Sequence, residues 1–346
     1  MALRYWRFAQ SYYVKDHRPT GSLPVIRVAL RYLRDCYGHT PVADFGPLAL
    51  EALQLRMVGD DLSRSTVNEQ IACIRRAFRW GVAKQLVPGA VLQALQALPG
   101  LRKARTPARE PEPVGPVSDE VVEATLPHMP AVVADMVRLQ RWTGCRPVEV
   151  CILRPCDVDT AGAVWRYRPE SHKTEHHGRE RVVFLGPKAQ DVLRPYLLRE
   201  KTMYCFVPAE SERKRRAEVH ERRRTPLSCG NRPGTNQRRR PKRFPGDHYT
   251  TASYRRAIDR AVELANRRAA QDAEARGEEP PASLPSWSPN QLRHTAATEI
   301  RQRFGLEAAQ TALADAAGPP APACDTNWTR RCPRPPARRS DGLSGS

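Results

Sequence analysis

The sequence predicts a mainly α-helical protein of two domains: an all-helical N-terminal bundle, and an α+β domain that holds a small antiparallel sheet. Three observations lead to this prediction. Apolar residues recur at helical spacing through the first hundred residues, a stretch rich in proline and charge follows, and two short strand-like segments interrupt the helices beyond it. The length of 346 residues suits two domains of roughly 150 residues each.

The helical domain is expected to span residues 1–101. Ser22 is placed to cap a helix that Gly38 ends. A second helix is expected to start at Thr66, which has the capping-box spacing to Glu69. One face of this helix is apolar, and three arginines off that face either meet solvent or touch phosphates. The apolar residues are Val67, Ile71, Ile74, Phe78 and Val82, and the arginines are Arg75, Arg76 and Arg79.

Charge is the strongest signal in the composition. The 57 Lys and Arg residues outnumber the 37 Asp and Glu residues, which gives a net charge of +20. Such a charge indicates a polyanionic partner rather than a merely solvated basic surface. No stretch is apolar enough to span a membrane and no signal-peptide core is present, so nucleic acid is favoured. Nine cysteines without a C-x-x-C pair indicate reduced thiols and a cytoplasmic location.

The remaining chain divides by composition. Residues 102–117 are rich in proline and charge and are expected to be a linker. The second domain is expected over 118–312, with a basic, flexible insertion at 211–243 and a disordered tail at 313–346. The arginines of the insertion are candidate DNA contacts, in particular Arg222, Arg223, Arg224, Arg238, Arg239 and Arg240.

The second domain should carry two strands among its helices. Residues 164–169 and 181–185 have strand character and flank a polar turn. Helices are expected over 131–142, 254–268 and 290–313. The small sheet and its turn therefore lie between two helical regions.

The first candidate site residue is Arg146. Pro147 suits the first turn of a helix, and Glu149 follows in that turn, where the helix dipole favours a carboxylate. Arg146 is thereby placed beside unpaired backbone N–H groups, which is a good position for binding a phosphate. The alternative is that Arg146 merely pairs with Glu149.

Two further segments contribute candidates. Lys173 lies in the polar turn between the two strands. Asn290 and Arg293 are three residues apart and share a helix face, with His294 beside them. His294 could instead be a buried histidine with structural contacts only.

These segments together resemble the tyrosine recombinase (phage integrase) family. The family has an arginine in the context T-G-x-R-x-x-E, a lysine in a β-turn and a later H-x-x-R-H motif. This sequence matches them with Arg146 and Glu149, with Lys173, and with Arg293 and His294. The segment STVNEQIACIRRAFRWGV also resembles the helical core-binding domain of the family. The resemblance covers most of the chain.

The resemblance implies site-specific recombination of double-stranded DNA, as in the integration or excision of a mobile element. Two arginines would fork onto the non-bridging oxygens of the phosphate, and the lysine would protonate the departing 5′ oxygen. A tyrosine would store the bond as a 3′-phosphotyrosine. The resemblance further implies no metal and no other cofactor, a clamp around DNA and a homotetramer on it.

Two departures from the family pattern place cleavage in question. Asn290 stands at the first histidine of the motif, and asparagine cannot relay a proton near neutral pH. The last tyrosine is Tyr254, so none follows Arg293. Cys324 lies near the expected tyrosine position, but nothing indicates an activated thiol. This chain is therefore predicted to be inactive in cleavage.

The sequence beyond Leu313 suggests a reason. The expected L-G-H segment reads Leu-Ala-Asp, and a tail of proline, alanine and arginine follows. This change is typical of a shifted reading frame in GC-rich DNA, and a truly divergent tail is the alternative.

Other functions remain open. A non-catalytic DNA-binding protein derived from a recombinase fits the missing tyrosine, whereas an RNA-binding protein fits the charge but not the ordered motifs. His172, His176 and His177 form a weak metal template in the polar turn, so we expect no metal. Cys145, Cys151 and Cys156 are expected to be small, mostly buried apolar residues.

Overall fold

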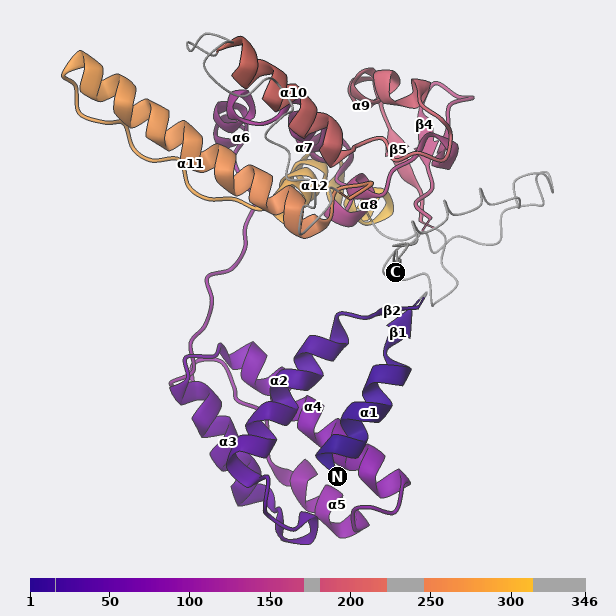
Figure 1. The fold of residues 1–346 in the computed structure, drawn as a ribbon, viewed down its shortest axis with the longest axis vertical. Helices are drawn as coiled ribbons and strands as arrows, with labels where there is room; N and C mark the ends of the chain where they lie inside the picture. Colours follow the sequence, from indigo (N-terminus) through magenta and orange to yellow (C-terminus); the bar gives the residue numbers. More distant parts are fainter. Residues whose placement is uncertain (16, 171–180, 223–245, 314–346) are drawn as a thin grey trace, which may run out of the picture. The chain divides into compact units, whose positions relative to one another are not determined.

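A computed structural model of the protein divides into two compact units, Met1–Pro113 and Val114–Ser346 (Figure 1). The division falls inside the stretch 102–117 that the sequence analysis assigns to a linker. Each unit has its own apolar core. The structure describes residues 1–15, 17–170, 181–222 and 246–313.

The first unit is a bundle arranged around one long helix, α4 (Arg64–Ala83), which contacts four other helices. Four of the five residues of its predicted apolar face are buried, and Val82 is partly buried. The predicted apolar face of α4 is therefore confirmed. The other elements are α1 (Ala2–Tyr12), β1 (Val14–Lys15), β2 (Arg18–Pro19), α2 (Ser22–Tyr37), η1 (Val42–Asp44), α3 (Pro47–Gly59) and α5 (Gly89–Ala97).

The helix starts in this unit differ from the predicted ones. Ser63, and not Thr66, caps α4, because its hydroxyl accepts the backbone N–H of Thr66. Ser22 is the first residue of α2 and makes no capping bond. Gly38 does end α2, but with a right-handed φ of −60°. A serine or threonine near a helix start thus predicts that a helix is present, but it does not identify the residue at which the helix begins.

The stretch predicted as a linker is bonded to folded residues near its middle and at its C-terminal end. The backbone N–H of Arg64 donates to the carbonyl of Arg109 at 3.0 Å, and the Arg64 guanidinium pairs with Glu110. The backbone N–H of Val117 donates to the Thr295 hydroxyl at 3.0 Å. Arg109 and Glu110 therefore pack with the first unit, and Val117 packs with the second.

The second unit combines helices with a three-stranded antiparallel sheet of order β3-β4-β5. Trp165 pairs with Leu185 and Tyr167 with Val183, as expected for the predicted hairpin. The mainly helical fold with a small antiparallel sheet is thus confirmed, and β3 is an addition. The elements up to the sheet and just beyond it are α6 (Asp119–Thr125), η2 (Leu126–His128), α7 (Ala131–Thr143), α8 (Pro147–Cys151), η3 (Pro155–Asp157), β3 (Val158–Asp159), β4 (Trp165–Tyr167), β5 (Val183–Leu185), α9 (Pro187–Leu193) and η5 (Arg194–Leu198).

Helix α10 (Pro208–Glu221) occupies the start of the segment predicted to be a flexible insertion. Glu212 pairs with Arg215 at 2.8 Å and with Arg216 at 2.7 Å, one helical turn away. Such pairs at i+3 and i+4 stabilise a helix that lacks an apolar face. Residues 211–221 are thus helical in this structure, the flexibility of the insertion stays a prediction, and residues 223–245 lie outside the described part.

Two long helices complete the unit, α11 (Thr251–Arg276) and α12 (Pro289–Leu313). The segment between them returns along α11 (Figure 1), held by Asn266, which exchanges two hydrogen bonds with the backbone of Leu284. Helix α12 bends at Gly305, whose φ is 87°. Among the described residues, none of the helices combines the length and apolar character needed to cross a lipid bilayer.

Candidate functional site

Arg146 occupies the N-cap of α8, as the sequence analysis expects. Its backbone N–H donates to one oxygen of Glu149 at 2.8 Å, and its Nη1 donates to the other at 2.9 Å. The Glu149 side chain is fully buried, whereas that of Arg146 is 21% exposed. Because α8 has only five residues, its dipole is small, and the positive charge at this place comes mainly from side chains.

Helix α12 brings Arg293 to the same place. Its Nη1 donates to the carbonyl of Gly144 and its Nη2 to the carbonyl of Leu313, both at 2.6 Å. Burial lowers the pKa of Arg293, and the positive charges of Arg181 and Arg146 lower it further. A guanidinium in such surroundings gains from a nearby anion.

Gly144 makes this approach possible. It ends α7 in the left-handed conformation with a φ of 61°. A Cβ atom there would lie 2.5 Å from the Leu313 side chain and 3.1 Å from that of Ala296. The glycine of the T-G-x-R motif thus serves both the turn and the contact between α7 and α12.

Gln140, which the sequence analysis did not single out, links two segments of the candidate site. Its side chain is buried, and its amide donates to the carbonyls of Cys145 and Pro289 at 3.1 and 3.0 Å. It therefore ties the segment before Arg146 to the start of the helix that carries Arg293. A single glutamine in an apolar helix gives no signal in the sequence that identifies this role.

Arg181 is the second residue that the sequence analysis missed, because it was assigned only to a strand. Its guanidinium is completely buried and pairs with Glu149 at 3.3 Å. Three arginines from separate segments therefore meet around one carboxylate. Cys145 is buried beside them, and burial, followed by the charge of Glu149, raises the pKa of its thiol to about 12. Cys145 and Cys151 are buried and Cys156 is partly buried, as predicted.

The other predicted site residues of the second unit are either exposed or outside the described part of the chain. Asn290 and His294 are exposed on the first turns of α12, so His294 is not the buried histidine considered as an alternative. Arg222 is exposed just after α10. Outside the described residues lie Lys173, Cys324, the turn histidines His172, His176 and His177, and the insertion arginines Arg223, Arg224, Arg238, Arg239 and Arg240.

The nearest upstream tyrosines in the sequence are buried. Tyr254 is fully buried, and burial raises the pKa of its phenol well above the usual value. The Tyr249 hydroxyl donates to Ser211 at 2.8 Å, and burial raises its pKa as well. Both hydroxyls are thus held in the protein interior in their neutral form.

In the first unit, Arg75, Arg76 and Arg79 line one hollow together with Ala72 and Gln96. The guanidinium of Arg75 donates to the carbonyls of Leu95 and Leu98 at the end of α5. Arg75 therefore also bonds within its own unit, whereas Arg76 and Arg79 are exposed, and all three remain predicted DNA contacts.

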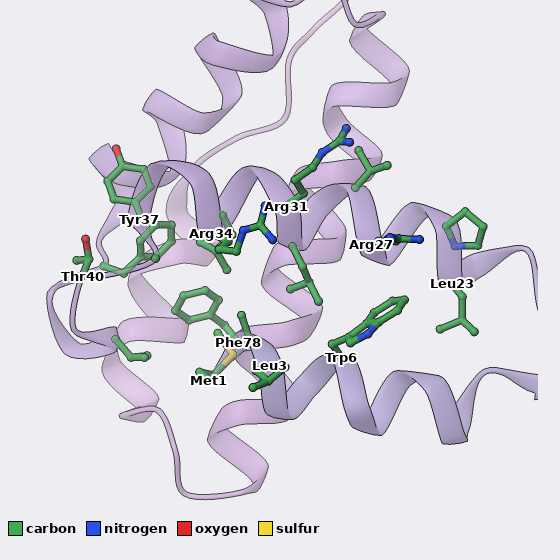
Figure 2. A pocket seen from close by; sticks show the side chains of 18 of the residues that line it. Met1, Leu3, Trp6, Leu23, Arg27, Arg31, Arg34, Tyr37, Thr40 and Phe78 are labelled. Carbon is green, nitrogen blue, oxygen red and sulfur yellow. The ribbon is translucent and has the colours of Figure 1, made fainter.

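A second hollow of about 990 Å³ lies between α1 and α2 (Figure 2). Trp6, Leu23 and Phe78 are among its apolar lining residues, and Arg27, Arg31 and Arg34 extend from α2 along its other side. These three arginines were not singled out from the sequence. They lie at successive turns of α2, which gives that helix an exposed basic stripe.

Comparison with known proteins rests on structure. No protein-family model and no curated protein matches the sequence. A lambda integrase dimer bound to a COC' core site matches 97% of this chain and 97% of its own, with 12% identity and a TM-score of 0.58. The Tn1549 transposon integrase in complex with circular intermediate DNA matches 90% of this chain and 89% of its own, with 17% identity and a TM-score of 0.54.

The chain has the tyrosine recombinase fold. A lambda integrase tetramer bound to a Holliday junction also matches it, over 94% of this chain and 74% of the integrase, at 12% identity and a TM-score of 0.57. The match covers both units, so the predicted fold class is confirmed along most of the chain. In this fold, Arg146 lies at the start of α8 and Arg293 on α12. Arg146 pairs with Glu149, and the charge of Glu149 also acts on Arg293.

Proposed function

We propose that this protein binds double-stranded DNA and holds one phosphodiester between Arg146 and Arg293 without cutting it. The observation that carries the proposal is that Arg146 and Arg293 meet at the turn after α7, where Glu149 holds Arg146 and the carbonyl of Gly144 holds Arg293. Burial and the charges of Arg146 and Arg181 together lower the pKa of Arg293, so an anion at this place would relieve their repulsion. A DNA phosphate is the anion that suits a protein with a net charge of +20.

Arg146 and Arg293, called the two clamp arginines below, suit the binding of a phosphodiester. Each guanidinium offers a planar fork of N–H donors that suits two phosphate oxygens. Arg293 uses one donor on Gly144 and one on Leu313, and these bonds fix the orientation of its plane. Donors that are oriented in advance lose little freedom when the phosphate arrives. Asn290, exposed on the same helix face, is a further hydrogen-bond partner for a phosphate oxygen.

Cleavage would require a nucleophile that this chain lacks. The last tyrosine is Tyr254, and it lies in the interior with Tyr249. Lys173 remains our candidate for protonating a departing 5′ oxygen, and no metal or other cofactor is part of the proposal. Binding and polarisation of the phosphate can therefore proceed, but no covalent bond to the protein forms.

The remaining parts of the proposal concern assembly. Related structures include DNA-bound dimers and a tetramer of lambda integrase. We extend this arrangement to the present chain as a homotetramer on DNA in the cytoplasm. The unit formed by residues 1–101 would be the core-binding domain and 118–312 the catalytic domain. Arg76 and Arg79, together with the stripe of α2, supply exposed charge for DNA in the first of these.

Two measurements test the proposal together. Fluorescence anisotropy should show tighter binding to duplex DNA than to a structured RNA of equal length at the same salt. A nicked suicide substrate, incubated with the protein and then denatured, should yield no protein–DNA band. Preference for the RNA would contradict DNA binding, and a denaturation-resistant band would contradict the absence of cleavage.

A second candidate function is active recombination by a chain with a different C-terminus. Leu313 contacts the site directly, through its carbonyl to Arg293 and its side chain against Gly144. If the nucleotide sequence after the codon for Gln310 encodes an L-G-H segment and a tyrosine in another frame, the graft of that segment should restore the covalent adduct. Absence of such a segment in every frame would favour the non-cutting protein.

A further inference from the structure

Arg181 stands out because its charged group has no access to water. It lies at the start of the strand segment that leads into β5, and its side chain is 0% exposed. A guanidinium taken out of water loses much solvation, and only well-placed partners compensate for this loss. The partners of Arg181 therefore indicate why a charge is placed there.

Arg181 contacts a partner of each clamp arginine. Its Nε and Nη2 face the two oxygens of Glu149 at 3.3 and 3.5 Å, and its Nη1 donates to the carbonyl of Leu313 at 3.2 Å. The same carboxylate holds Arg146. The same carbonyl accepts a hydrogen bond from Arg293. One buried side chain is thus linked to both guanidiniums through two shared acceptors.

We propose that Arg181 is a positioning residue, which orients Arg146 and Arg293 for a phosphate without touching that phosphate itself. The inference rests on the proposed function and deepens it.

Charge gives the first reason. Glu149 is fully buried, so a single counter-charge would draw the Arg146 guanidinium inward. Arg181, whose side chain is completely buried, supplies a second positive charge beside the same carboxylate. Arg146 keeps its partly exposed position, in which its side chain can reach a ligand.

Geometry gives the second reason. The planar fork of Arg181 spans both carboxylate oxygens and fixes the carboxylate plane. A lysine would keep the charge but present a single point donor, so the plane would be free to turn. The variant Arg181→Lys therefore separates orientation from charge.

The test is a double-mutant cycle on duplex DNA of fixed length and salt. In the native background, Arg146→Ala should weaken binding roughly tenfold or more. In the Arg181→Lys background, Arg146→Ala should weaken it only about threefold or less, because the lost orientation removes most of the Arg146 contribution. An equal effect of Arg146→Ala in both backgrounds would overturn the proposal.

Arg154→Lys is the matched control. Arg154 is also almost fully buried and forks onto a carboxylate, that of Asp157 at 3.0 Å, but it pairs there and with Glu170 rather than with Glu149. Its replacement should lower the melting temperature comparably while leaving the Arg146→Ala effect unchanged. If Arg154→Lys reduces that effect as much as Arg181→Lys does, general loosening explains the result and the proposal fails.

A measurement on the native protein tests the proposal even if the variants fold poorly. Nitrogen-15 spectra of the arginine Nε–H groups should show shifts of Arg146 and Arg293 upon addition of DNA, with Arg181 slow to exchange and nearly unshifted. A comparable shift of Arg181 would make it a phosphate ligand and overturn the positioning role. If Arg146→Ala and Arg293→Ala bind DNA as the native protein does, the proposed function itself fails.

Discussion

Two arginine-rich regions of the second unit differ in what surrounds the charge. Arg146 and Arg181 pair with Glu149 and have side chains that are 21% and 0% exposed, and the partly buried Arg293 lies within electrostatic reach of all three. On α10, Arg215 and Arg216 are 57% and 52% exposed and pair with Glu212 on their own helix. The total charge of the chain therefore does not locate the site. The candidate site is distinguished instead by the burial of its arginines and by the acceptors that they share.

The largest expected effect comes from removal of the central acid of the buried region. Glu149→Ala leaves Arg181 buried without this carboxylate, which should lower the free energy of unfolding by about 3–5 kcal/mol. Glu212→Ala on α10 is the exposed counterpart and should lower it by less than about 1 kcal/mol. Chemical denaturation of both variants measures the contrast, and similar losses would show that the two regions do not differ.

Gly144→Ala should have the next largest effect. The new Cβ would meet Leu313 at 2.5 Å in a residue with a φ of 61°, at an expected loss of about 1–3 kcal/mol. Gly59→Ala is the control, because nothing lies within 4 Å of its added Cβ. DNA affinity should fall with Gly144→Ala as well, since the carbonyl of Gly144 orients Arg293. Full affinity in a folded Gly144→Ala variant would argue against that orientation.

The first unit offers a smaller version of the same comparison. Arg75→Lys removes bonds to the carbonyls that end α5, and should lower the free energy of unfolding by about 1–2 kcal/mol. Arg79→Lys, at an exposed position of the same helix, should leave stability unchanged within about 0.5 kcal/mol. Thermal melting distinguishes them. Equal melting temperatures of the two variants would show that the bonds of Arg75 to α5 do not stabilise the unit.

The smallest expected effect is on the salt dependence of DNA binding. Arg213 and Lys214 are exposed on α10, and each phosphate that they neutralise contributes about 0.9 to the slope of log K against log salt. The double substitution by alanine should reduce that slope by no more than about 1 unit. An unchanged slope would mean that α10 lies away from the DNA.

The sequence was sufficient for those parts of the fold that depend on periodic or motif-bound residues. The apolar face of α4 follows from spacing alone, and Pro147 and Glu149 mark the start of α8 wherever it packs. The pairing of the two strands followed from their composition. Each of these features is set by residues close together in the chain.

The sequence was insufficient where distant segments meet. Arg181 has the pattern of a first strand residue, and only the fold brings it to Glu149. Gln140 and Arg75 gain their roles from carbonyls far away in the sequence. Helix α10 was missed because its stability comes from local ion pairs and not from an apolar face. Long-range contacts of this kind leave no local pattern.

The central claim is that the partly buried Arg146 and Arg293, and not the exposed arginines of α10, hold the phosphate. The most direct measurement compares duplex DNA binding of Arg293→Ala with that of Arg213→Ala at one salt concentration. We expect a roughly 10–100-fold loss for Arg293→Ala, as for a charge-assisted hydrogen bond, and less than about a threefold loss for Arg213→Ala. Equal losses in the two variants, both still folded, would contradict the account.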